Sequence, residues 1–248
     1  MSKDALYPEP PHLTVAVWSP EDEESVFGRA CDVVVAAGCV PAGVVESAPR
    51  GQQYAMLQDL DDRSTAQLGA SAFETAVHGG DPILRPLKAG YRVKGWGTVV
   101  VEHLFGTEGE THPVAVSLAA DRLGLPDSTW KASDRKAARR LAAWATGVLR
   151  ELTVSTGAMY GAIGVEETLP TPSALRAGAP VGSVVFVGSA LPDGVQARFK
   201  AALPGVQWPA GEFFPGWHPF AESPAPVDRK ALAAASVALG EALSGSAE

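Results

Sequence analysis

The chain has 248 residues, of which 46% are hydrophobic and 19% are charged, and this composition excludes a disordered protein. The net charge of −8 argues against a general nucleic-acid binder, because neutralising phosphates requires a surplus of lysine and arginine on the binding face. Two cysteines, Cys31 and Cys39, are too few for a disulfide scaffold, and their apolar neighbours favour buried hydrophobes over a redox or metal pair.

The overall sequence also indicates where the protein is located and how many domains it has. No apolar run reaches the roughly 18 residues that a membrane-spanning helix needs, and residues 1–13 lack the apolar core of a signal peptide. We therefore expect a cytoplasmic protein with no membrane partner and no cofactor. Abundant alanine and an excess of arginine over lysine are typical of a bacterial, GC-rich genome. A single domain over 1–248 is expected, and if the chain divides, the proline-containing loop at 124–131 is the best boundary.

The first elements are a strand and a capped helix. Residues 13–18 are apolar and rich in β-branched side chains, which predicts a strand. Ser19 and Pro20 then predict a helix start, and the acids at 21–24 suit the positive end of the helix dipole. The helix start accounts for this acidic cluster without a metal ion, and Gly38 ends the helix.

Short segments follow up to the middle of the chain. Strands are predicted at 44–45 and 54–57, and a helix is predicted from Asp61 or Asp62 to Ala76. A loop with two prolines comes next. The runs at 91–93, 98–105 and 113–118, separated by glycine-rich turns, predict an antiparallel meander.

The second half contains the best-defined helix, predicted over 133–154. Its apolar residues follow the spacing of one helical face: Leu141, Trp144, Ala145, Val148 and Leu152. Strands are then predicted at 159–165 and 183–187, one helical turn within 170–180, and helices at 193–203 and 228–243. Because strands and helices do not alternate regularly, we expect an α+β fold with a mixed, mainly antiparallel sheet and helices packed on it.

The sequence holds no recognisable catalytic or phosphate-binding motif: it has no GxxxxGK[ST], no GxSxG and no HExxH. His103 and His112 flank a predicted turn near Glu102 and Glu110, so a His–His–carboxylate metal site is one alternative. Strand alternation places Glu102 and His103 on opposite sheet faces and weakens it, so no metal is expected. Glu166 ends a strand and offers an acid–base partner for Glu102. An enzyme would therefore use Glu102, His103 and Glu166.

Two further segments stand out. The stretch 208–220 is dense in aromatic residues, which either fill the core or line a recognition surface. Its candidate recognition residues are Trp208, Phe213, Phe214, Trp217 and His218.

A cluster of cations occupies the start of the predicted long helix, where positive charge opposes the helix dipole. Its members are Lys131, Arg135, Lys136, Arg139 and Arg140, and Asp134 is the only acid among them. The spacing makes a stripe of like charges opposite the apolar face. The stripe is either a solvated surface or a site for an anion or an acidic partner, which the helix N-terminus would assist.

Two stretches resemble bacterial toxin-immunity proteins of the Imm52-like type. One is LTVAVWSPEDEE, a strand that runs into an acidic helix start, and the other is TGAMYGAIGVEE followed by TPSALRAG. The resemblance is one of layout over about half of the chain. It implies a compact α+β protein that binds and blocks a toxin and has no catalysis of its own.

We therefore expect a non-enzymatic binding protein with a protein partner, either an immunity protein or an accessory factor. The alternative is a small-molecule enzyme with a carboxylate–histidine site and the basic stripe as an anion clamp. A third alternative is a structural subunit of a bacterial assembly, which glycine-rich strands with exposed edges would suit.

Overall fold

The computed structural model describes residues 5–50, 63–104, 109–121, 123, 131–217, 219–221 and 226–244. These residues form ten strands and six helices. The strands are β1 (His12–Trp18), β2 (Val40–Pro49), β3 (Ser64–Gln67), β4 (Leu84–Val93), β5 (Gly97–His103), β6 (Val114–Ala119), β7 (Tyr160–Val165), β8 (Val184–Gly188), β9 (Val206–Trp208) and β10 (Gly211–Pro215). The helices are α1 (Glu23–Ala36), α2 (Ala70–Val77), α3 (Ala132–Ser155), α4 (Pro172–Arg176), α5 (Asp193–Ala202) and α6 (Arg229–Ser244).

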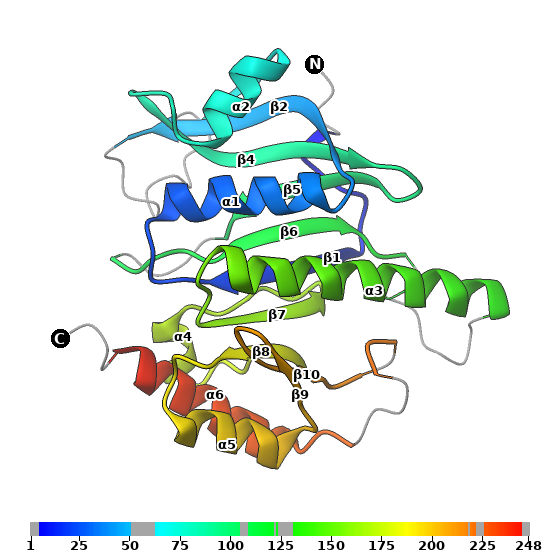
Figure 1. The fold of residues 1–248 in the computed structure, drawn as a ribbon, viewed down its shortest axis with the longest axis vertical. Coiled ribbons are helices and arrows are strands. Elements are labelled where there is room, and N and C mark those ends of the chain that lie inside the picture. The colour runs from blue at the N-terminus through cyan, green and yellow to red at the C-terminus, as the bar shows by residue number, and fades with distance from the viewer. Residues whose placement is uncertain are drawn as a thin grey trace.

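The strands make one sheet in the order β3-β2-β4-β5-β6-β1-β7-β8-β10-β9 (Figure 1), and each neighbouring pair is antiparallel. The expected α+β fold with helices packed on a sheet is confirmed. The predicted meander is β4-β5-β6. β1 lies between β6 and β7, so the first strand of the chain joins the strands that precede α3 to those that follow it.

Helices α1 and α3 cover one face of the sheet, which we call the first face (Figure 1). Side chains alternate along β1, so that Leu13, Val15 and Val17 join the apolar core beneath these two helices. The predicted helix is present, but it starts three residues later than Ser19 and Pro20 indicated. Its cap is Asp22, whose carboxylate accepts a hydrogen bond from the Ser25 amide at 3.0 Å, whereas the Ser19 hydroxyl donates to the Thr156 carbonyl oxygen instead.

The opposite, second face is covered by different elements along its length. Helices α4, α5 and α6 cover β7, β8 and β10 and form a second apolar core with Ala16 and Trp18 of β1. Over β4 lies the N-terminal segment instead: a side chain at Gly90 would come within 2.4 Å of the Ala5 carbonyl oxygen. Ala5 and Leu6 are buried there against Val44.

The predicted helix from Asp61 or Asp62 to Ala76 is wrong over its first part. Residues 64–67 form the edge strand β3, which pairs with β2 from Val44 to Ser47, and the helix begins only at Ala70 after Gly69. The segment STAQ carries no apolar helical face and gains backbone hydrogen bonds from β2. The predicted strand at 54–57 and the Asp61 or Asp62 cap lie outside the described residues.

The expected loop around Pro86 is instead part of a ten-residue strand, β4. Pro86 is tolerated because it lies opposite Ser47, beside a shift in the β2–β4 register. The aromatic segment also forms paired strands, since β9 and β10 make a hairpin at the end of the sheet. In the described ranges, no helix is long and apolar enough to cross a membrane.

Candidate functional site

Helix α3 has two halves with different surroundings. Its second half is buried through Leu141, Ala145, Val148, Leu149 and Leu152, whose spacing keeps one apolar face on the sheet. None of residues 132–137 is buried. Figure 1 shows this N-terminal end projecting past the ends of β1 and β7. The sequence-predicted helix over 133–154 is confirmed, with Lys131 as its cap residue.

The projecting half carries the cationic face, which we define as Lys131, Arg135, Lys136, Arg139 and Arg140. All five side chains are exposed. Among the described residues, no carboxylate lies within ion-pair distance of Lys131, Lys136, Arg139 or Arg140. Asp134 is engaged locally, because its carboxylate accepts a hydrogen bond from the Lys131 amide at 3.2 Å. Within the described part of the chain, four of the five cations therefore have no carboxylate at ion-pair distance.

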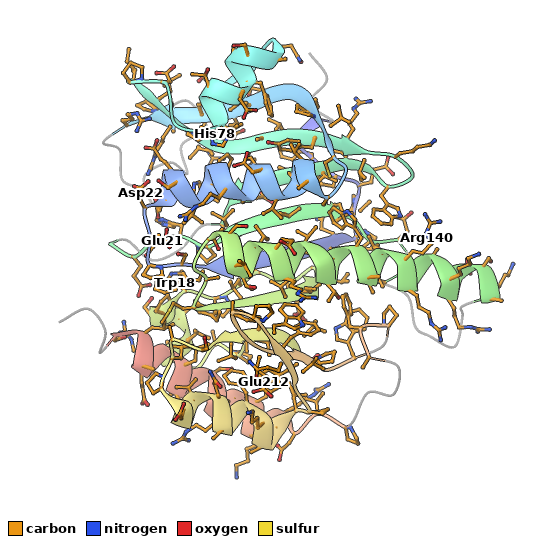
Figure 2. The ribbon with its side chains drawn as sticks, in the orientation of Figure 1. Trp18, Glu21, Asp22, His78, Arg140 and Glu212 are labelled. Atoms are coloured by element: carbon orange, nitrogen blue, oxygen red, sulfur yellow. The ribbon has the colours of Figure 1, made fainter. Side chains whose placement is uncertain are left out.

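The cationic face borders two shallow depressions. One, of about 360 Å³, is lined by Arg135, Lys136, Arg139 and Arg140. The other, of about 380 Å³, lies where α3 meets the β4–β5 turn. Its lining includes Trp96 and the acidic residues Glu9 and Asp121. Arg140, labelled in Figure 2, borders both. Guanidinium groups one helical turn apart suit carboxylates on a partner, since each arginine can donate two parallel hydrogen bonds to one carboxylate.

The three catalytic candidates do not share a site. Glu102 lies on the second face, where it contacts the Lys88 ammonium at 2.9 Å and accepts a hydrogen bond from the Ser117 hydroxyl at 2.9 Å. His103 lies on the first face and stacks on Phe27 with ring centroids 5.0 Å apart. These contacts bear out the alternation expected for neighbouring strand residues.

Glu166, the third candidate, is held at a strand end. Its carboxylate accepts a hydrogen bond from the backbone amide of His12 and lies 3.3 Å from the His12 ring nitrogen. Its backbone adopts a positive φ of 54°, and its side chain is half exposed. Glu166 and Glu102 thus have separate partners, and no acid–base pair forms between them.

A buried polar cluster lies at the start of α1, and the sequence did not predict it. The Glu23 carboxylate accepts a hydrogen bond from the His112 amide at 2.7 Å, lies 2.7 Å from His112 Nδ1, and lies 3.7 Å from the Arg85 guanidinium. His103 is buried beside these groups. His103 and His112 do lie near each other, but their shared carboxylate is that of Glu23 rather than of Glu102 or Glu110.

The environment of this cluster shifts the pKa values of Glu23 and His103. Burial raises the pKa of Glu23, but hydrogen bonds from the side chain and amide of His112 outweigh it, and the net pKa is lowered. Burial lowers the pKa of His103 to about 4; His112 and Arg85 add to this effect, and Glu23 opposes it. A neutral imidazole stacked under α1 is therefore part of the core.

The aromatic candidates are mostly core residues. Trp208 stacks on Phe213 at 4.3 Å on the first face, and Phe214 packs against Phe199 at 5.8 Å on the second. Their exposed fractions are 8%, 4% and 0%, so these three are not available to a partner. Trp217 is half-buried against Phe220, and His218 lies outside the described residues. The core alternative thus holds for the three rings of the hairpin.

The cysteines are buried thiols, as the sequence indicated. Burial raises the pKa of Cys31 and raises that of Cys39 to about 11. Neither residue is therefore a thiolate at neutral pH, and neither is activated for nucleophilic chemistry.

No protein-family model matches this chain, and no curated protein is significantly similar to it. The function therefore has to be argued from the geometry above.

Proposed function

We propose that this protein is a non-enzymatic binding protein that docks on the acidic surface of a partner protein through the cationic face of α3. The observation that carries the proposal is the projecting helix end, with five exposed cations and a single acid, Asp134, among them. An immunity or accessory factor that blocks its partner is the biological role that fits this binding face, since Glu102, His103 and Glu166 each have separate partners.

The placement of the charge supports binding over an ordinary solvated surface. Cations at a helix N-terminus oppose the macrodipole, and like charges one turn apart repel each other, so the free protein bears a cost of a few tenths of a kcal/mol for each such contact. An acidic partner relieves both effects on binding. At the start of α1 the same chain places acids instead, at Glu23 and Glu24.

The protein's net charge favours a protein partner over a nucleic acid. A nucleic acid would approach a molecule of net charge −8, which repels its phosphates overall. A folded partner with a local acidic patch can be complementary to the cationic face. The rest of the partner's surface then need not approach the negatively charged parts of this protein. Electrostatic steering of this kind accelerates association and makes it sensitive to salt.

The test uses affinity capture followed by measured binding. Wild-type protein and the double variant Arg135→Glu/Arg139→Glu are immobilised, and the captured partner is identified by mass spectrometry. Isothermal titration calorimetry with the purified partner then gives the dissociation constant. We expect the double variant to bind at least about tenfold more weakly, because charge reversal replaces attraction by repulsion.

Arg150→Glu is the matched control, since Arg150 is an exposed cation on the same helix outside the cationic face. It should bind like wild type, and circular dichroism should show all three proteins folded. A double variant that binds its partner as tightly as wild type would refute the proposal. A captured nucleic acid in place of a protein would refute it as well.

A further inference from the structure

Three metal-ligating side chains meet on the outer surface where α1 and α2 pack together. Asp32 comes from α1, Glu74 from α2, and His78 follows the last residue of α2 as its cap. His78 Nε2 lies 3.3 Å from Asp32 Oδ1 and 3.2 Å from Glu74 Oε1. Among the described residues, this is the one group of three such side chains whose ligand atoms all lie within 4.8 Å of one another.

We propose that Asp32, Glu74 and His78 bind a divalent transition-metal ion, with zinc as the best fit. In a tetrahedral zinc site with ligand bonds of about 2.0–2.1 Å, neighbouring ligand atoms are about 3.3 Å apart. The two nitrogen-to-oxygen distances already have that value. The imidazole nitrogen is thus already placed at a suitable distance from both carboxylates.

The chemistry of the ligands also fits. Two carboxylates and a neutral imidazole carry a charge of −2, which a divalent cation cancels. The side chains are 37% exposed for His78, 61% for Asp32 and 66% for Glu74, so water can fill the remaining coordination position.

Gly28 makes room for the imidazole. A Cβ atom at this position of α1 would lie 2.6 Å from His78 Nδ1, closer than such atoms approach in folded proteins. Any other residue at position 28 would displace the imidazole from its present position between Asp32 and Glu74. The glycine is otherwise unfavourable, because glycine in the middle of a helix costs about 1 kcal/mol relative to alanine. The close approach of His78 is a structural reason for glycine at position 28.

A bound ion would link two helices that otherwise meet through few contacts. α2 has eight residues and buries only Phe73 and Val77. A metal held by Asp32 on α1 and by two ligands from the other helix fixes their relative position. The ion should therefore stabilise the folded protein, since a ligand that binds only the native state adds to its free energy of unfolding.

Isothermal titration calorimetry with zinc chloride on the full chain tests the proposal. We expect one site with a dissociation constant below about 100 μM and a rise in melting temperature when zinc is added. His78→Ala should weaken zinc binding at least about tenfold. Gly28→Ala keeps all three ligands and improves helix propensity, and it should also weaken binding because it displaces the imidazole.

His12→Ala is the control, since it removes a partly exposed histidine that also lies beside a carboxylate, that of Glu166. It should leave zinc affinity unchanged. Equal affinity in wild type and His78→Ala, or a loss caused by His12→Ala alone, would overturn the proposal. So would a wild-type protein that shows no saturable zinc binding, which would leave the cluster as a surface ion pair.

Discussion

His103 is a histidine that the fold keeps uncharged. It is 5% exposed, stacks on Phe27, and lies close to Glu23, His112 and Arg85. Of these neighbours, only the carboxylate favours the protonated ring, and burial outweighs it, so the pKa falls to about 4. An unfolded chain returns this histidine to its ordinary pKa of about 6.5.

This difference makes stability depend on pH. Between about pH 6.5 and pH 4, the unfolded chain binds a proton at His103 that the folded protein does not, so stability falls as the pH is lowered. The loss should approach about 3 kcal/mol at about pH 4. Urea unfolding at a series of pH values measures it. His103→Gln should flatten the slope in this window, whereas His12→Gln should keep it. An unchanged slope in His103→Gln would show that other groups cause the pH dependence.

Lys88 is the centre of a charged ladder that crosses the second face of the sheet. Its ammonium pairs with Glu102 at 2.9 Å, its register partner Glu46 is 6% exposed, and the Arg63 guanidinium lies 3.4 Å from Glu46. Burial lowers the pKa of Lys88, but Glu102 and Glu46 outweigh it and the net pKa is raised. The lysine thus stays charged and neutralises buried carboxylates.

Replacing Lys88 by methionine should therefore be costly. Lys88→Met leaves Glu102 without its cation in a mostly buried position, and the loss of one partner from such a pair destabilises by about 3–5 kcal/mol. Arg29→Met is the matched control, because its pair with Glu21 is solvent-exposed and should contribute less than about 1 kcal/mol. Chemical denaturation measures both. Equal effects of the two substitutions would mean that the ladder is as well solvated as the exposed pair.

At the level of elements, the two halves of α3 should differ in stability. Residues 132–137 bury nothing, whereas Ala145 is fully buried against the sheet. Ala137→Gly should cost about 1 kcal/mol in helix propensity, and its effect should stay local, as faster amide hydrogen exchange at the start of the helix. Ala145→Gly should lower global stability by more, because it also removes a buried methyl group. Faster exchange along the whole of α3 in Ala137→Gly would contradict this division.

The contrast between α3 and β3 explains which elements could be predicted. α3 repeats its apolar spacing over several turns, so local sequence determines both its existence and its bounds. β3 has four exposed residues and exists because β2 offers an unpaired edge. Similarly, the sequence does not show why glycine is needed at position 211, where a side chain would approach the Val187 carbonyl oxygen. That glycine permits two strands to pair closely, which no local pattern reveals.

The site residues divide in the same way. The cationic face could be recognised because its members lie within ten residues on one helix. Glu74 and the α2 cap residue His78 are also an i, i+4 pair, but Asp32 joins them only when α1 and α2 dock. The contact between Glu23 and His112 spans 89 positions, and it depends on where the residues just before β6 meet the start of α1. Long-range pairs of this kind follow from topology rather than from residue spacing.

Across the whole molecule, β1 holds the sheet together. Val15 pairs with Val116 of β6 on one side and with Ile163 of β7 on the other. β1 therefore lies between two groups of strands. The group β2 to β6 lies on one side of it, and β7, β8 and β10 lie on the other. Because α3 packs on β1 and β7 while α1 packs on β5 and β6, the first-face core also runs across this junction.

We therefore expect cooperative unfolding of the sheet as one unit, although many chains of this size unfold through intermediates. Val15→Ala removes fully buried methyl groups from β1 and should cost about 2–3 kcal/mol. Hydrogen exchange should then show equal loss of protection in β4-β5 and in β8-β10, and fluorescence and circular dichroism should give coincident urea transitions. Loss confined to one group of strands would instead mean that the chain folds as two units, with the boundary near 124–131. The shared strand argues against that outcome. If β1 unfolded together with one group of strands, the other group would be left with an unpaired edge and an exposed core.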